Sequence, residues 1–186
     1  MVKKSIVIIS LLILLLVGYY IIFEYGNEKN DYFEEIEQEV LSLKLNSSRV
    51  AHIEYINDDY ALAIFEWEIS HAGIAELEKH RGDWHVVASA SDRYSHTPYF
   101  VQLSHFSVIY GLSSGGAEEG YVELQDGSKH AISIEGGEWT PAFWFYYSED
   151  EDLSNAKVTS KDEDGEIIFE LDIDDKPNEG LERQID

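Results

Sequence analysis

The chain has 186 residues, with 37 acidic against 13 basic side chains, a formal net charge of −24 and no cysteine. This excess of carboxylates argues against nucleic acid as a partner, because binding phosphates requires Lys and Arg side chains. The absence of cysteine excludes disulfides, thiolate metal sites and a cysteine nucleophile. An apolar content of 44% is enough for a packed core, so the chain is not a disordered acidic tail.

The first predicted element is an uncharged apolar run over residues 5–23, which follows a short stub, residues 1–4. A helix of this length spans about 30 Å, the thickness of a bilayer's hydrocarbon core. The run is longer than a cleavable signal core and lacks small residues at its exit, so we expect a retained transmembrane helix. Lys3 and Lys4 predict a cytoplasmic N-terminus and an extracytoplasmic remainder, in a single-pass type II cell-membrane protein.

A polar linker over residues 24–30 leads to a predicted amphipathic helix over residues 31–44. Its apolar residues recur at helical spacing and share one face: they are Phe33, Ile36, Val40 and Leu43. The stripe favours packing on the domain's own sheet. The alternative is a self-assembly module through residues 31–44, although the stripe is short for a coiled coil.

The next part of the chain is rich in short β-prone runs. Residues 49–68 read as a hairpin around the turn formers Asn57 to Asp59. Residues 70–82 predict a short helix, with Ile74 and Leu77 inward and a stop at Gly82. A strand follows from Asp83, and residues 99–111 predict one long strand or two strands joined by a bulge.

The second half of the chain reads as a series of hairpins. Residues 111–120 are rich in Gly and Ser, which marks a possible sub-boundary or a mobile loop. Two hairpins are expected, one around Asp126 and Gly127 and one around Asp162 to Gly165. Residues 174–186 look like an acidic disordered tail. The expected fold class is therefore α+β: a transmembrane helix, one amphipathic helix and a mostly antiparallel, β-rich extracytoplasmic domain over residues 31–173.

The aromatic run after Pro141 is the richest in the chain, and the proline favours an edge strand or a strand start. Strand alternation puts Phe143, Phe145 and Tyr147 on one face and Trp144 and Tyr146 on the other. If one face of this strand is buried, Trp144 and Tyr146 are partly presented to solvent. These two residues are the candidate ligand-binding side chains, although core packing is the simpler interpretation.

Other patterns point only weakly to chemistry. Gly111 to Gly115 match the G-x-S-x-G pattern of a hydrolase, which would make Ser113 the nucleophile, but strand rather than helix is expected afterwards. Nothing in the spacing selects His105 or Asp126 as its partners. The histidines lack metal-ligand spacing, and the acidic runs at 149–152 and 162–164 do not fit an EF-hand loop. We therefore expect no catalytic residues, no cofactor and no metal site, with weak calcium binding left open.

Several loose motifs follow one another between residues 60 and 172. They are Trp84, Tyr110-Gly111, Tyr121 to Leu124, Asp126-Gly127, Trp139, Phe143 to Phe145, Val158 and Asp162-x-Asp164-Gly165-x-Ile167 to Glu170. In this order the chain resembles uncharacterised anchored envelope proteins of Gram-positive spore-forming bacteria. The resemblance implies an N-terminal anchor and a small β-rich extracytoplasmic module, and it implies no catalytic residues.

The sequence thus predicts a non-enzymatic binding, accessory or sensory module of the cell envelope. Its expected partners are the membrane, through residues 5–23, and an envelope protein, a peptide or a polymer. The alternatives are an envelope serine hydrolase that uses Ser113 and the self-assembly module described above. The oligomeric state does not follow from the sequence.

Overall fold

The computed structural model describes most of the chain after residue 31 and a short piece of the N-terminal apolar run. The described residues are 13–19, 32–43, 49–67, 71–93, 98–113, 117–135, 143–174, 176–179 and 181–182.

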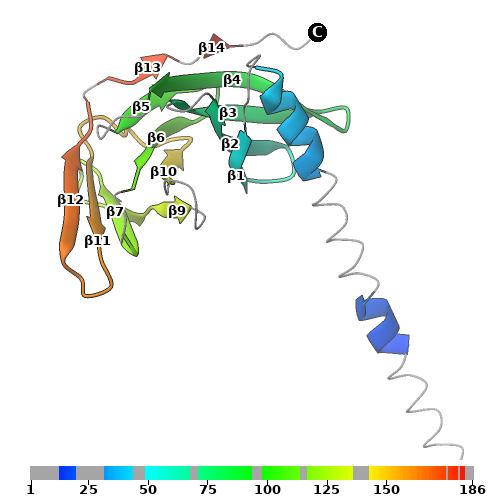
Figure 1. Cartoon of the computed structure of the whole chain (residues 1–186), viewed down its shortest axis with the longest axis horizontal. Helices are drawn as coiled ribbons and strands as arrows, with labels where there is room; N and C mark the ends of the chain where they lie inside the picture. The colour runs from blue at the N-terminus through cyan, green and yellow to red at the C-terminus, as the bar shows by residue number, and fades with distance from the viewer. Residues whose placement is uncertain are drawn as a thin grey trace, which may run out of the picture.

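The described residues contain three β-sheets (Figure 1). In spatial order, sheet A consists of β1 (Arg49–Tyr55), β2 (Tyr60–Trp67), β3 (His71–His80), β4 (Asp83–Arg93) and β14 (Leu181–Glu182). Sheet B consists of β13 (Asn178–Glu179), β5 (Tyr99–Gln102), β6 (Ser107–Leu112), β10 (Phe143–Ser148) and β9 (Ser133–Glu135). Sheet C consists of β12 (Ile167–Asp172), β11 (Lys157–Lys161), β7 (Glu119–Glu123) and β8 (Lys129–Ala131). All strand pairs are antiparallel except β13 with β5.

Sheet B is the middle layer, and it is covered on both faces. Its residues Val101, Val108, Tyr110, Phe143 and Phe145 pack against sheet A. The alternate residues Phe100, Ile109 and Trp144 pack against sheet C. Because side chains alternate along a strand, each strand of sheet B supplies two separate cores.

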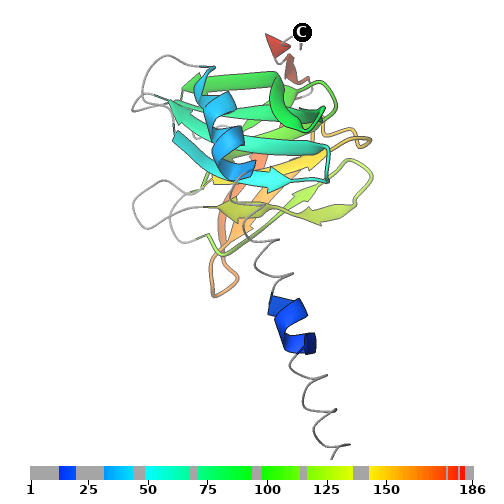
Figure 2. The same ribbon diagram turned by 90° about the vertical axis from the view of Figure 1, so that its right-hand side faces the viewer.

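The helix of residues 32–41 forms a fourth layer, on the outer face of sheet A (Figure 2). Ile36 and Val40 are completely buried against Ala61, Phe65 and Leu77. This confirms that the apolar stripe packs on the domain's own sheet. The prediction for Phe33 is wrong, because its side chain is exposed; the ring of Tyr32 instead meets the edge of Trp84 at a centroid distance of 6.4 Å.

The α+β fold class is wrong, because the structure is mostly antiparallel β and its two described helices are short, covering residues 13–19 and 32–41. The largest error lies at residues 70–82, where the expected helix is the central strand β3. Ile74 and Leu77 are spaced for a helix, and Ala and Glu are good helix formers. The strand instead buries Ile74 toward sheet B and Leu77 toward the helix, so tertiary pairing overrides local propensity.

Within the described residues, no helix is both apolar enough and long enough to cross a membrane. Most of the predicted 5–23 span lies outside the described residues, and its described part is the helix of residues 13–19. At the other end of the chain, the expected tail supplies β13 and β14, which pair with β5 and β4.

The hairpin predictions are mostly confirmed. β7 pairs with β8 around Gly127, and β11 pairs with β12 around Gly165; both glycines have positive φ, as tight turns require. Residues 99–111 form two strands, β5 and β6, joined by a turn in which Leu103 N–H donates to the Phe106 carbonyl at 2.9 Å. Of the two positions that Pro141 suggested, the edge is wrong, because β10 lies between β6 and β9, whereas a strand start agrees with β10 beginning at Phe143.

Candidate functional site

Four segments that are distant in sequence meet where the turns of sheets A and B come together. They contribute Tyr60 at the start of β2, Glu76 in β3, His105 and Phe106 in the β5–β6 turn, and Tyr147 near the end of β10. We call these five residues the His105 cluster. Turns clustered at one end of a β-sandwich are a common place for binding sites, because a rigid scaffold positions them.

The centre of the cluster is a hydrogen-bonded pair of a buried carboxylate and a surface imidazole. The Glu76 side chain is completely buried, whereas that of His105 is 46% exposed. The His105 ring Nδ1 donates to Glu76 Oε1 at 2.6 Å, and the His105 backbone N–H donates to Oε2 at 3.1 Å. Both carboxylate oxygens are thus satisfied, which a buried charge requires. The pair fixes the ring and leaves Nε2 as the nitrogen that can meet a ligand.

Aromatic rings surround the imidazole. The ring of Tyr60 lies 4.9 Å from that of His105, measured between centroids. Phe106 meets Tyr60 and Tyr147 edge to face, each at 5.9 Å. Tyr60 and Tyr147 are both half-buried, so part of each ring remains available at the surface.

Carboxylates dominate the electrostatics of the cluster. The pKa of Tyr60 is raised by desolvation and then by the nearby carboxylates of Glu78, Glu76, Asp59 and Glu149. The pKa of Tyr147 is raised by desolvation and then by Glu54 and Glu149. Lys79, which follows Glu78, does not offset these charges, because it points to the opposite face of sheet A. Its ammonium there lies 3.9 Å from the Tyr32 ring centroid. The aromatic surface therefore lies in a negative potential.

Local sequence explains why these side chains converge. Asn57 Oδ1 accepts hydrogen bonds from the backbone N–H groups of Asp59 and Tyr60, at 2.8 and 2.9 Å, which fixes the β1–β2 turn. The register between β3 and β4 shifts between Glu76 and Leu77, because Val87 is an extra residue of β4 at this point. Glu76 itself follows the alternation of β3 and shares the face of Ile74, toward sheet B.

The two residues proposed from sequence as ligand-binding do not form one surface. Trp144 is 1% exposed, and its Nε1 donates to the Leu112 carbonyl at 3.2 Å, so it belongs to the core between sheets B and C. Tyr146 is half-buried, and its hydroxyl donates to Glu151 Oε2 at 2.5 Å. Its pKa is raised by desolvation and by this hydrogen bond. Trp144 and Tyr146 do share one face of β10, as strand alternation predicts, but sheet C covers that face.

The hydrolase pattern lacks its structural context. Ser113 directly follows β6, and only residues 114–116 separate it from the next described residues, which lead into β7. Three residues leave no room for the helix that a nucleophile elbow requires. Gly111 has a packing role instead, because a Cβ at this position would lie 2.7 Å from the Trp144 ring.

The possible partners of a serine nucleophile also lie apart. His105 is bound to Glu76, whereas Asp126 accepts hydrogen bonds from the backbone and side chain of Ser128 in the β7–β8 turn. The nearby His130 contacts both Ser128 Oγ and Glu151 Oε1 through the same nitrogen, Nε2. A Ser–His–acid relay needs both ring nitrogens, so this arrangement is not one.

Metal-binding groups do not gather in the part of the chain that the structure describes, where no cluster of three or more His, Asp or Glu side chains could hold an ion. In the acidic run at 162–164, Asp162 Oδ1 accepts from the backbone N–H groups of Asp164 and Glu166 and thereby forms the turn. Asp152 similarly accepts from Ser154. These carboxylates stabilise turns.

Sequence reasoning missed Glu76, the residue on which the cluster depends. The helix expected over residues 70–82 has Ile74 and Leu77 inward and assigns no role to Glu76. The available signal was its position between Ala75 and Leu77 in an otherwise apolar run, since a charged residue inside a buried strand requires a partner. The partner is 29 residues away in sequence, and nothing local identifies it.

No family model, curated protein or solved structure matches the chain.

Proposed function

We propose that this protein is a membrane-anchored binding module of the cell envelope, and that its His105 cluster recognises a cationic group, the amine or guanidinium of a basic peptide or polymer. The observation that carries this proposal is the position of the partly exposed Tyr60 ring among the carboxylates of Glu78, Glu76, Asp59 and Glu149. A cation near such a ring gains from both the ring face and the negative potential.

The chemistry of the cluster favours binding over catalysis. His105 and Glu76 resemble the imidazole and carboxylate of a catalytic pair, but the described neighbours of the His105 ring are aromatic rings and carboxylates. Such rings and carboxylates suit a bound cation. The buried pair instead holds the β5–β6 turn against sheet A.

The location is proposed from residues 5–23, with Lys3 and Lys4 on the cytoplasmic side and the β-domain outside. In the described part of that run, the side chains of Ile13 to Val17 are 50 to 71% exposed. A continuous apolar surface of this kind is typical of contact with lipid or a partner. Protease added to intact cells should digest the β-domain, whereas full protection would contradict an exterior location.

Binding can be tested by titrating the purified full-length chain in detergent micelles with hexalysine. The informative variant is Tyr60→Ala, because it removes the ring without changing the charge. We expect it to weaken binding roughly 2- to 30-fold, the range for exposed to desolvated cation–π contacts.

Tyr60→Phe, which keeps a ring, should bind like the wild type. Tyr121→Ala is the matched control, because Tyr121 lies in sheet C, where its ring carries Lys129 at 4.6 Å. Equal affinities for the wild type and Tyr60→Ala would refute the site, since any binding would then reflect net charge alone.

A further inference from the structure

The most unusual free surface outside the His105 cluster is the edge of sheet C. β12 pairs with β11 on one side, and in the described part of the chain no strand pairs with its other side. In Figure 1 the β11–β12 hairpin projects from the body with β12 outermost. In an antiparallel ladder, alternate residues of such a strand direct their N–H and C=O groups outward, which provides a template for another strand.

β12 is only partly protected as an edge: it carries a bulge at its start and the carboxylates of Glu170 and Asp172. Its sequence, IIFELD, contains neither proline nor lysine, and its side chain at Ile167 is 58% exposed. The bulge opposite Ser160 and Lys161 affects only the start of the strand. The other long edge strand, β1, carries a bulge and the charged side chain of Arg49, which is paired with Glu66 at 2.6 Å.

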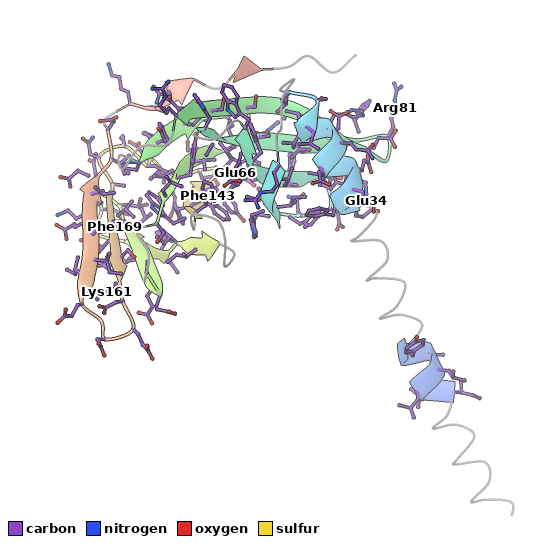
Figure 3. All side chains as sticks on the ribbon, in the orientation of Figure 1. Glu34, Glu66, Arg81, Phe143, Lys161 and Phe169 are labelled. Atoms are coloured by element: carbon purple, nitrogen blue, oxygen red, sulfur yellow. The ribbon has the colours of Figure 1, made fainter. Side chains whose placement is uncertain are left out.

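One face of β12 is incompletely covered. The ring of Phe169 lies 6.1 Å from that of Trp144 and extends the core between sheets B and C, yet both Phe169 and Leu171 remain only half-buried. Figure 3 shows Phe169 on the hairpin, with Lys161 farther toward its tip. A strand added beside β12 would cover these side chains with its own apolar residues.

The opposite face carries a row of charges that alternates from strand to strand. Lys129 on β8 bonds Glu123 on β7 at 2.8 Å, and Lys157 on β11, the direct cross-strand neighbour of Glu123, bonds Glu170 on β12 at 3.1 Å. Asp172, the cross-strand neighbour of Lys157, also lies on β12. The row therefore runs positive, negative, positive, negative, and it ends on carboxylates at the edge.

From this arrangement we propose that the β12 edge binds an extended segment of another protein, which adds as a fifth strand and alternates basic with apolar residues. The basic side chains continue the charge row beyond Glu170 and Asp172, and the apolar ones cover Phe169 and Leu171. A second copy of this chain fits poorly, because its own β12 would bring carboxylates to the same edge in a chain of net charge −24.

The probe is a fluorescent heptapeptide of alternating Lys and Val, titrated into the full-length chain in detergent micelles. A Lys–Pro heptapeptide of equal charge is the first control, because proline cannot donate to a strand ladder. A Glu–Val heptapeptide is the second. We expect the Lys–Val peptide to bind at least about tenfold more tightly than either control.

The test variant is the double substitution Glu170→Lys with Asp172→Lys, which should weaken Lys–Val binding at least about tenfold and strengthen Glu–Val binding. Glu163→Lys with Asp164→Lys makes the same charge change in the β11–β12 turn, away from the edge, and should have a much smaller effect. Tyr60→Ala weakens binding of the peptide at the His105 cluster, but the preference for Lys–Val over Lys–Pro should remain in this variant, which separates the two surfaces.

Three results would overturn the proposal: equal binding of the Lys–Val and Lys–Pro peptides, equal loss in the two double variants, or loss of the preference for Lys–Val over Lys–Pro in Tyr60→Ala. A dimer of the wild-type chain in sedimentation that dissociates in Glu170→Lys with Asp172→Lys would instead assign the edge to a second copy.

Discussion

At the scale of single residues, the most informative feature is Glu76, an acidic side chain buried inside the β-sandwich. Glu76 is completely buried, and its two oxygens are held by the side chain and the backbone of His105. Removing one partner of such a pair leaves the other group buried without compensation, so both partners are needed together. Glu76 therefore connects the strand pairing of sheet A to the position of the β5–β6 turn.

Glu76→Ala should lower the free energy of unfolding by about 3 kcal/mol, because the His105 backbone N–H and imidazole lose a charged acceptor and a cavity remains. Urea unfolding of the full-length chain, followed by tryptophan fluorescence, measures the change. Glu78→Ala is the control: this neighbour is less buried and should cost less than about 0.5 kcal/mol. Equal losses would show that the pair contributes nothing specific.

The residue scale also explains why Gly111 is glycine. A Cβ at this position would lie 2.7 Å from Trp144 Cζ2, inside the core between sheets B and C. The glycine therefore makes room for a buried indole, and the resemblance to a hydrolase pattern is incidental to its role.

Gly111→Ala should destabilise the fold by about 1–3 kcal/mol, the usual cost of overpacking a core. Combining it with Trp144→Phe, whose smaller ring relieves the clash, should give a loss clearly below the sum of the two single losses. Thermal or urea unfolding of the four proteins completes the cycle. Strict additivity would mean that the indole does not limit position 111.

At the scale of elements, the helix of residues 32–41 shows what decides which of its faces is buried against sheet A. The sequence proposes a stripe of four apolar residues, but the observed orientation buries Ile36 and Val40 fully and leaves Phe33 at 40% exposure. The preceding residue, Tyr32, packs inward instead, and its ring contacts Lys79 and Trp84 of sheet A. The sheet beneath the helix thus decides which residue at its start packs inward.

Ile36→Ala should cost about 2–5 kcal/mol, because it creates a cavity between the helix and sheet A. Phe33→Ala should change stability by less than about 0.5 kcal/mol, because its side chain lies largely in solvent. Chemical unfolding of both variants provides the comparison. A larger loss for Phe33→Ala would contradict the observed orientation of the helix.

At the scale of the whole molecule, the net charge of −24 opposes compaction. Like charges spread over one small domain repel one another, and salt screens this repulsion over a Debye length of about 10 Å at 0.1 M and about 3 Å at 1 M. Exposed ion pairs, such as Lys129 with Glu123, contribute little against this repulsion.

The melting temperature of the full-length chain should therefore rise when sodium chloride is increased from about 0.05 to 1 M. A melting temperature that falls with salt would show that attractive surface pairs outweigh the repulsion. Sodium and potassium chloride should act alike, because the effect depends on ionic strength.

The sequence by itself determined the local features of this protein. The Asp126-Gly127 and Asp162 to Gly165 signals identified two hairpins, because a tight turn needs a residue that tolerates positive φ. The alternation along residues 143–147 was also legible, because strand geometry has a period of two. Composition alone indicated an acidic chain with a real core.

Only the tertiary structure decided which surfaces are covered and which distant residues meet. Residues 71–80 became a strand because β2 and β4 flank them, although their helix-forming composition indicated otherwise. Trp144 became core because sheet C covers the face that it shares with Tyr146. The contact between Glu76 and His105 depends on how sheets A and B pack, and long-range packing of this kind leaves no periodic signal in a single sequence.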